Sequence, residues 1–317
     1  MTESLQRPDP EISIVIPLLN EEESLSELRK EIDNALKDFR SYEIIFVDDG
    51  SKDDSWEVIA DMSRNDERVR GISFRNNYGK SVALQAGFEK CKGHYVVTMD
   101  ADLQDDPNEV PEMIEMLDAG YDLVSGWKKV RHDPITKTIP SKFFNFVTRK
   151  AAGIELHDFN CGLKAYRAEV VSNIYLYGEL HRYIPMLAKR EGFDRIAEKV
   201  VQHHPRKFGK TKFGISRFMN GFLDLVTILF VQKYLQKPMH LFGTVGTILL
   251  LVGGGINIYL AYVKLILGEG IGDRPLLFLG ILLMVLGVQI FSTGLIAELV
   301  NKNHVEKQKP RIRDYVN

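Results

Sequence analysis

The segment VVTMDADLQDDP, residues 96–107, passes from β-branched, apolar residues into a cluster of four aspartates. These are Asp100, Asp102, Asp105 and Asp106. Two carboxylates about 4 Å apart repel each other by roughly 1 kcal/mol in water, and by several times more near a protein surface. Because such crowding requires compensation, a divalent cation is the first candidate ligand for this segment.

Asp100 and Asp102 stand two residues apart at the end of a run that is typical of a β-strand. Side chains alternate along a strand, so both carboxylates point to one face if the strand geometry persists. Their hard oxygen donors suit Mg²⁺ or Mn²⁺, which usually bind through one or two carboxylates and the phosphates of a substrate. Asp105 and Asp106 precede Pro107 and a predicted helix, and we interpret them as capping and helix-dipole residues.

Short apolar strands alternate with amphipathic helices through residues 12–126. The predicted order is the strand ISIVIP, a helix over about 22–39, the strand YEIIFVDD, a helix over about 53–64, the strand VRGISF, a helix over about 79–90, and the strand HYVVTMD. This alternation predicts an α/β domain with a mostly parallel sheet and helices on both faces. Ligands of such sheets bind beyond the carboxyl ends of the strands. Three of the predicted strands end in acidic residues, at 17–21, 48–49 and 100–102, so these ends are expected to converge.

Several classes of protein are disfavoured by what the sequence lacks. No G-x-G-x-x-G follows the first strand and no G-x-x-x-x-G-K-[ST] occurs, so a dinucleotide-binding fold or a P-loop NTPase lacks its phosphate cradle. The formal net charge of −2 gives no general electrostatic case for nucleic acid. Cys91 and Cys161 lack metal-ligand spacing, which predicts neither a zinc site nor a disulfide framework but a reducing, cytosolic setting. We also expect no secretory signal peptide, because the first ten residues contain no apolar segment.

Two uncharged runs near the carboxyl end predict a transmembrane hairpin. Residues 241–263 and 275–297 each contain 23 residues without a charge. A helix of that length, rising about 1.5 Å per residue, reaches about 34 Å and crosses the hydrocarbon core. A buried helical pair in a soluble core is the alternative, but such helices rarely extend so far without a charged edge.

Flanking charges predict the orientation of this hairpin. Basic residues lie before the first span, at Lys233 and Lys237, and five follow the second span, whereas two basic and two acidic residues balance in the connector. Cytoplasmic flanks carry the excess of Lys and Arg. We therefore expect a multi-pass protein of the inner (plasma) membrane with its catalytic domain and both termini in the cytoplasm.

Two further segments have the composition of helices that lie in a membrane interface. Residues 216–237 are apolar on much of their circumference yet contain four charged side chains, and residues 140–153 form a shorter candidate. Basic residues just before the longer segment favour an anionic lipid surface. Either segment could instead be an amphipathic helix packed on the domain. The predicted domains are a cytosolic catalytic domain (1–213), an interfacial helix (214–238), a transmembrane hairpin (239–300) and a basic cytosolic tail (301–317).

Five motifs of this chain, in order, form a recognisable pattern: IPLLNEEESL, VDDGSKD, NNYGKSVALQAG, MDADLQDDP and DFNCGLKAYR. They resemble the family 2 glycosyltransferases with a GT-A fold, and within them the polyprenyl-phosphate glycosyltransferases, which include dolichol-phosphate mannose synthases and bactoprenol glucosyltransferases. The resemblance covers about residues 11–215, and the pair of spans is similar to that of two-span members. It implies a metal-dependent hexosyltransferase.

The resemblance also implies how the nucleotide of a nucleotide-sugar is held. Pro17, Leu19 and Glu21, with Asp48 or Asp49, would contact the base and the ribose. By local chemistry alone, Asp49 could equally cap the helix that follows it.

The same resemblance implies roles at the diphosphate. Asp100 would lie near the ribose and diphosphate, and Asp102, with Gln104 beside it, would hold Mg²⁺ or Mn²⁺; all three are candidate metal ligands. Lys80 is a phosphate contact or, alternatively, only a charge on a helix face.

On the acceptor side, Asp158 matches a carboxylate that is a base or positioning residue in this family. An aspartate that forms a turn before Asn160 is the alternative. The acceptor implied by the resemblance is a polyisoprenyl phosphate, whose head group requires cations. Arg131 and Arg206 are our first choices among the basic residues, because arginine can bind phosphate through two parallel hydrogen bonds.

The function predicted from these patterns is inverting transfer of a hexose to a polyprenyl phosphate on the cytosolic leaflet, with UDP-glucose as the first choice of donor. Transfer of mannose or an amino sugar from a GDP- or UDP-sugar, a non-lipid acceptor, and a catalytically inactive sugar-nucleotide-binding protein are the alternatives. A processive polysaccharide synthase is disfavoured because Q-x-x-R-W is absent. Glycines in the first span permit close helix contacts and leave a homo-oligomer open.

Overall fold

The computed structural model describes residues 10–129, 148–149, 153–205, 207, 238–272 and 274–305. The chain divides into two compact units, Met1–Met219 and Asn220–Asn317, and each is described by itself. Arg131, Arg206, most of the two predicted interfacial helices and the tail from residue 306 lie outside the described residues.

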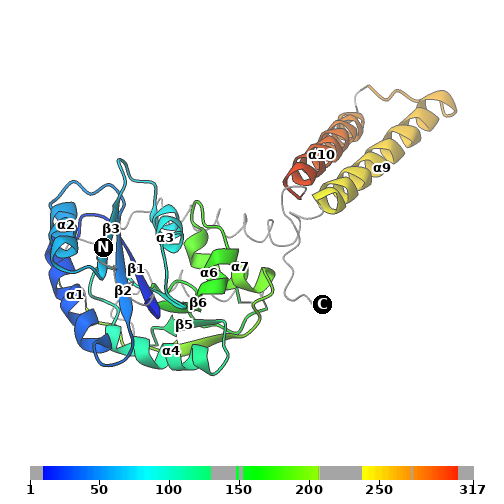
Figure 1. Ribbon diagram of the computed structural model, residues 1–317. Coiled ribbons are helices and arrows are strands. Elements are labelled where there is room, and N and C mark those ends of the chain that lie inside the picture. The colour runs from blue at the N-terminus through cyan, green and yellow to red at the C-terminus, as the bar shows by residue number, and fades with distance from the viewer. Residues whose placement is uncertain are drawn as a thin grey trace. The chain divides into compact units, whose positions relative to one another are not determined.

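A seven-stranded sheet forms the centre of the first unit (Figure 1). Its strands are β1 (Ile12–Leu18), β2 (Tyr42–Asp48), β3 (Val69–Ser73), β4 (Tyr95–Thr98), β5 (Leu123–Trp127), β6 (Lys164–Arg167) and β7 (Ile196–Val200). The strand order is β3-β2-β1-β4-β6-β5-β7. Strand β6 is antiparallel to both of its neighbours, β4 and β5, whereas the other pairs are parallel. The prediction of a mostly parallel sheet is confirmed.

Helices cover both faces of this sheet (Figure 1). They are α1 (Glu22–Leu36), α2 (Ser55–Asn65), α3 (Lys80–Phe88), α4 (Val110–Asp118), α6 (Ala168–Asn173) and α7 (Ile184–Arg190), with 3₁₀ turns η1 (Pro107–Glu109) and η2 (Leu180–Tyr183). Helices α1, α2 and α4 contribute to one hydrophobic cluster, whereas α3, α6 and α7 contribute to the other. The helices predicted near 22–39, 53–64 and 79–90 are therefore confirmed, with ends that differ by a few residues.

The local sequence explains why these elements form. All seven residues of β1 are buried, as expected for a strand that is covered on both faces. Ile14 and Ile16 join the α1 side of the core, and Val15 between them joins the α3 side. Helix α1 buries apolar residues three or four positions apart, including Leu25 and Leu28.

The direction of each strand decides which residues meet at one edge of the sheet. Strands β1, β2, β4, β5 and β7 point the same way, so their carboxyl ends share an edge. Antiparallel β6 begins where β4 and β5 end, since Lys164 lies opposite both Thr98 and Ser125. The turn that precedes β6 therefore reaches the same edge as the acidic ends of β1, β2 and β4.

The second unit contains helices α9 (Pro238–Leu265) and α10 (Pro275–Val305). Both are long and apolar enough to cross a membrane, and only 17% and 11% of their most apolar windows are buried. Neither helix is mostly buried in the described structure, as the helices of a soluble core would be. The helices pack closely at glycines: a Cβ at Gly246 would lie 2.8 Å from the Gly287 carbonyl oxygen, and one at Gly253 would lie 2.7 Å from that of Gly280.

Candidate active site

The carboxyl ends of β1 and β2 are joined into one rigid edge. The Asn20 N–H donates to Ser51 Oγ at 2.8 Å, and the Lys52 N–H donates to Asn20 Oδ1 at 2.7 Å. The Glu21 N–H donates to Ser55 Oγ at 3.0 Å. Asn20 adopts a left-handed conformation, with φ at 54°, which asparagine tolerates better than most residues. These bonds fix the backbone where the resemblance places the base and ribose of a nucleotide.

The residues predicted to contact the nucleotide along β1 differ in exposure. Pro17 is buried within the strand, whereas Leu19 and Glu21 lie partly exposed just beyond it. Glu21 occupies the N-cap position of α1 without a capping hydrogen bond from its side chain. Leu19 and Glu21 are thus the members of this set that a ligand can reach.

Asp48 and Asp49 are both buried and hold neighbouring loops. Asp48 accepts the Ser51 N–H at 2.9 Å and the Ser73 hydroxyl at 3.0 Å. Asp49 accepts the N–H groups of Tyr78 and Gly79, at 2.7 and 2.9 Å. The alternative that Asp49 caps α2 is therefore wrong, because its carboxylate binds the loop before α3. Burial raises the pKa of Asp49, although the two N–H groups act in the opposite direction.

Lys80 and Asp100 form an ion pair between the start of α3 and the end of β4. The interpretation of Lys80 as a mere charge on a helix face is therefore wrong. The enclosure of Asp100 disfavours its ionisation, but the positive charges of Lys80 and Lys128 outweigh that effect and lower its pKa to about 2. Asp100 retains about a third of its side-chain surface, at 35%, so its charge remains accessible from solvent.

Gly162 packs directly against the Asp100 carboxylate. A Cβ on Gly162 would lie 2.7 Å from the carboxyl carbon of Asp100, closer than a real Cβ contact. The Gly162 carbonyl in turn accepts the Thr98 hydroxyl at 2.9 Å, which ties the turn before β6 to the last residue of β4. A side chain at this position would force the Asp100 carboxylate to shift.

Asp105 has a role that the sequence did not predict. Its carboxylate pairs with Lys128 at 2.7 Å and also accepts the Asp100 N–H at 3.2 Å. The Asp105 side chain is only 1% exposed and that of Lys128 is 13% exposed, so this is a buried ion pair beneath the acidic segment. The interpretation of Asp105 as a capping residue is wrong, whereas Asp106 does cap η1 by accepting the Asn108 N–H at 2.9 Å.

Asp102 and Gln104 lie on either side of a residue with unusual backbone geometry. Leu103 has a φ of 59°, a left-handed conformation that is uncommon for a bulky residue and occurs often at functional sites. Asp102 is partly exposed, and its Oδ1 accepts the Gln104 N–H at 3.3 Å. Gln104 Nε2 donates to the His204 carbonyl at 3.4 Å, which leaves the amide oxygen as its acceptor group.

This donor set fits a divalent cation that is shared with a diphosphate. Among the described residues, no three His, Cys, Asp or Glu side chains gather to hold a metal by themselves. Mg²⁺ and ions like it commonly bind through one or two carboxylates and complete their shell with phosphate oxygens and water. The partly exposed Asp102 carboxylate and the Gln104 amide oxygen are oxygen donors of that kind.

Asp158 is buried in the turn before β6, at the same edge of the sheet. Its Oδ1 accepts the Asn160 N–H at 3.1 Å, so the turn-forming role that we considered as the alternative is present. Its own N–H donates to Glu198 Oε1 at 3.1 Å. Asp158 thus closes the turn at the edge of the sheet where β4 and β5 end.

Lys164 and His181 also belong to this edge, although neither was predicted from the sequence. Lys164 is buried at the start of β6, its Nζ donates to the Cys161 carbonyl, and burial lowers its pKa. A single charged residue between the apolar residues Leu163 and Ala165 was a signal that could have been used. His181 interacts with the buried Ser81 hydroxyl at 3.0 Å, and burial together with the charge of Lys80 lowers its pKa well below the ordinary value. No local pattern marks His181, because Ser81 lies 100 residues away in sequence.

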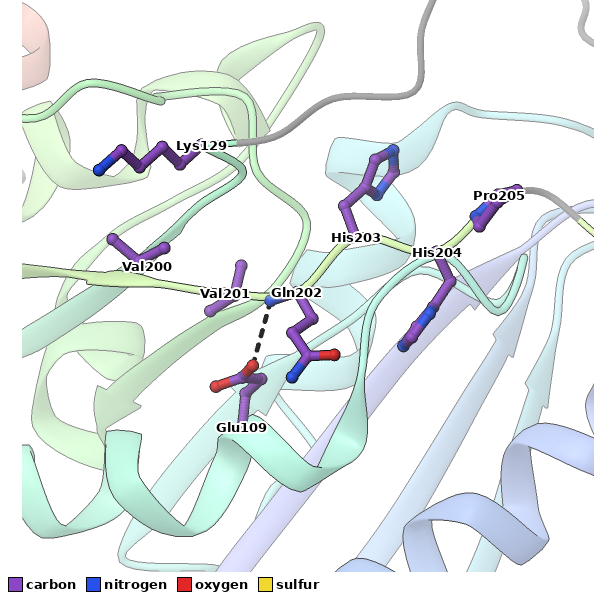
Figure 2. Close-up of a pocket in the computed structure, with 8 residues that line it drawn as sticks. All are labelled: Glu109, Lys129, Val200, Val201, Gln202, His203, His204 and Pro205. Atoms are coloured by element: carbon purple, nitrogen blue, oxygen red, sulfur yellow. Dashed lines mark hydrogen bonds between the residues drawn. The ribbon is translucent and has the colours of Figure 1, made fainter.

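A cavity of about 550 Å³ lies beside the extension of β7 (Figure 2). It is lined by Glu109, Lys129, Val200, Val201, Gln202, His203, His204 and Pro205. His203 and His204 point to opposite sides of this extended segment, and the Gln202 N–H donates to Glu109 at 3.1 Å (Figure 2). The His204 N–H donates to the Gln104 carbonyl at 3.0 Å. Because His204 lines the cavity and Gln104 belongs to the acidic segment, the cavity borders that segment.

Comparisons with known proteins agree with this geometry. Residues 13–175 match the family described as glycosyl transferase family 2. The chain belongs to glycosyl transferase family 2. It is 37% identical to a dodecaprenyl-phosphate galacturonate synthase of Rhizobium johnstonii, over 93% of this chain and 88% of that protein. It is 34% identical to an undecaprenyl-phosphate 4-deoxy-4-formamido-L-arabinose transferase of Aeromonas hydrophila, over 95% and 91% of the two chains.

The fold agrees with solved structures of more distant enzymes. Glucosyl-3-phosphoglycerate synthase of Mycobacterium tuberculosis, solved with Mn²⁺ and UDP-glucose, is similar with a TM-score of 0.53 and 23% identity. The match covers 70% of this chain and 79% of that one. The predicted GT-A fold and the prediction that this chain is a glycosyltransferase are thus confirmed.

Proposed function

We propose that this family 2 glycosyltransferase moves a sugar from a nucleoside diphosphate to a polyprenyl phosphate at the cytosolic face of a membrane. The observation that carries the proposal is the convergence of Asp100, Asp102 and Lys80 at one sheet edge, in a chain that also bears two helices of membrane-spanning length. Relatives similar along more than nine-tenths of this chain are named as a dodecaprenyl-phosphate galacturonate synthase and an undecaprenyl-phosphate 4-deoxy-4-formamido-L-arabinose transferase.

The donor would bind across the ends of β1, β2 and β4. Leu19 and Glu21 would contact the base and ribose over the loops that Asp48 and Asp49 hold in place. Lys80 would stand beside the diphosphate, since its partner Asp100 keeps its Nζ at the end of β4. The ion pair also keeps Asp100 ionised at neutral pH, because its pKa is about 2.

Asp102, with Gln104, would hold Mg²⁺ or Mn²⁺ against the diphosphate, with Asp100 close by. A bound cation would supply charge neutralisation for the departing diphosphate. Asp105 supports this arrangement from below, because it binds the backbone of Asp100 and the ammonium group of Lys128 together. These contacts would hold the backbone of Asp100 in position before a ligand binds.

The acceptor chemistry requires little proton transfer. The second ionisation of a phosphate monoester lies near a pKa of about 6, so its oxygen is already a nucleophile at neutral pH. We propose that Asp158 orients this oxygen and that Arg131 and Arg206 bind the remaining phosphate oxygens. In-line attack from the face opposite the diphosphate would invert the anomeric carbon.

The membrane would bring this acceptor to the enzyme. We propose that α9 and α10 span the inner membrane, with both termini in the cytoplasm, and that residues 214–238 lie in the interface. The flanking basic residues support this orientation.

The proposal also names a candidate for the transferred sugar. We retain glucose from UDP-glucose as the initial candidate, but the two relatives are named for galacturonate and 4-deoxy-4-formamido-L-arabinose. These names favour a modified sugar as the second candidate. UDP- and GDP-linked forms of glucose, mannose, galacturonate and 4-deoxy-4-formamido-L-arabinose form the donor panel.

The test uses the full chain in detergent, radiolabelled donors, undecaprenyl phosphate and either Mg²⁺ or Mn²⁺. We expect label to enter the organic phase with one donor, and to remain in the aqueous phase for Asp102→Asn. Donor binding without transfer would indicate an inactive binding protein, and labelled product confined to the aqueous phase would indicate a non-lipid acceptor. Either result would overturn the proposal.

A further inference from the structure

Two consecutive residues of the turn before β6 bind a single carboxylate on β7. Glu198 Oε1 accepts the N–H groups of His157 and Asp158, at 2.7 and 3.1 Å. Glu198 Oε2 interacts with His157 Nδ1 at 2.7 Å. The Glu198 side chain is only 11% exposed, so these contacts replace most of the water that an ionised carboxylate would otherwise bind.

The imidazole of His157 is also held from a second direction. It stacks on Trp127, with ring centroids 4.1 Å apart and an angle of 14° between the ring planes. Trp127 is the last residue of β5, and β5 pairs with β7 so that Ser125 lies opposite Glu198. Two neighbouring strands therefore fix one histidine, through its ring face and through Nδ1.

This arrangement determines where Asp158 can lie. The Asp158 residue is 1% exposed, its backbone is bonded to Glu198, and its carboxylate closes the turn by accepting the Asn160 N–H. A displacement of Glu198 would release the backbone on which that carboxylate is mounted. We infer that Glu198, which is itself held by His157 on the Trp127 ring, is the positioning residue for Asp158 on the acceptor side. This inference rests on the proposed function of Asp158.

The test is a double-mutant cycle on the full chain in detergent, with donor and undecaprenyl phosphate. Misplacement of a reacting group by about 1 Å can cost on the order of 100-fold in rate. We expect Glu198→Gln to lower kcat about 10-fold or more, with the donor KM unchanged. In the Asp158→Asn background, Glu198→Gln should cause no further loss, because the group that it positions is already absent.

Two further variants keep the result interpretable. His157→Phe retains an aromatic ring against Trp127 but removes the contact with Glu198 Oε2, and should produce a smaller kcat defect with the same non-additivity. If Glu198→Gln does not fold, His157→Phe replaces it in the double-mutant cycle. Glu57→Gln, an exposed glutamate on α2, should retain wild-type kinetics as the matched control.

The outcomes separate this inference from the proposed function. Glu198→Gln could lower kcat by the same factor in the wild-type and Asp158→Asn backgrounds. That result would overturn the positioning role of Glu198 and leave the proposed role of Asp158 intact. If only His157→Phe folds, the same comparison applies to that variant. If Asp158→Asn alone left kcat and the acceptor KM unchanged, the proposed role of Asp158 would fail, and the inference would fail with it.

Discussion

The Asp100 carboxylate is surrounded by groups that control its charge and its position. Lys80 pairs with one of its oxygens, Asp105 binds its backbone N–H, and Gly162 leaves room for its carboxyl group. Asp105 also forms a buried ion pair with Lys128. Removal of one member of a buried pair generally costs about 3–5 kcal/mol, because the other charge is left without compensation. The acidic segment thus depends on residues from three other parts of the chain.

Gly162→Ala tests this dependence with one added methyl group. The new Cβ would meet the Asp100 carboxyl carbon at 2.7 Å, so Asp100 must shift away from its position at the end of β4. We expect a loss in kcat/KM of roughly 10-fold or more, since displacement near 1 Å has large kinetic effects. Initial rates over a range of donor concentrations provide the measurement.

Gly270→Ala is the control for this change, because nothing lies within 4 Å of a Cβ built at that position. It should leave the kinetics unchanged. Wild-type kinetics for Gly162→Ala, in a protein with unchanged thermal stability, would show that the position of Asp100 is unimportant for donor binding or transfer.

At the scale of elements, the Lys80–Asp100 pair links α3 to β4 and gives the fold a pH dependence. The pKa of Asp100 falls from 3.8 to about 2 on folding, so the stabilisation is present above pH 4 and disappears as pH falls through 2. We expect Lys80→Met to have a lower Tm than wild type, with a constant difference from pH 5 to 8 and a shrinking one below 4. Thermal unfolding in detergent across this pH range is the measurement, and a Tm difference that changed most between pH 6 and 8 would contradict the assignment.

The α9–α10 hairpin offers two adjacent glycines with opposite surroundings. A Cβ at Gly253 would contact the backbone of α10, whereas one at Gly254 would meet nothing within 4 Å. Small residues permit this close approach of membrane helices. We expect Gly253→Leu to lower the thermal stability of the detergent-solubilised chain and its yield in membranes, while Gly254→Leu behaves as wild type. Equal effects of the two changes would mean that the helices do not pack through this face.

The sequence predicted the elements of the domain better than their contacts. Hydrophobic periodicity located β1 to β4 and α1 to α3 because those signals are local. It did not reveal that β6 is antiparallel, since the KAYR strand has no feature that records its direction. Lys128 and His181 were missed for a related reason: their partners lie far away in sequence. Asp105 was misinterpreted because it stands close to the start of a predicted helix, where aspartates are favoured as caps, and its burial could not be read from the motif.

For the whole molecule, the central expectation is a hairpin with both ends on one side of the membrane. The connector between α9 and α10 should then face the opposite side from the catalytic domain. We expect Gly270→Cys, in intact cells, to react with a membrane-impermeant maleimide, and Glu57→Cys in the catalytic domain to react only after lysis. Labelling of Glu57→Cys in intact cells would place the catalytic domain outside.

The central prediction is that sugar transfer requires a divalent cation held by Asp102. The deciding measurement is the amount of labelled undecaprenyl-phosphate sugar formed by purified wild-type protein and by Asp102→Asn, each assayed with Mn²⁺, with Mg²⁺ and with EDTA. We predict product for the wild type only when a divalent cation is present, and at least a 100-fold loss for Asp102→Asn, by analogy with the loss of a preorganised charge-stabilising group. Undiminished transfer by a folded Asp102→Asn protein, or by the wild type in EDTA, would contradict the central claim.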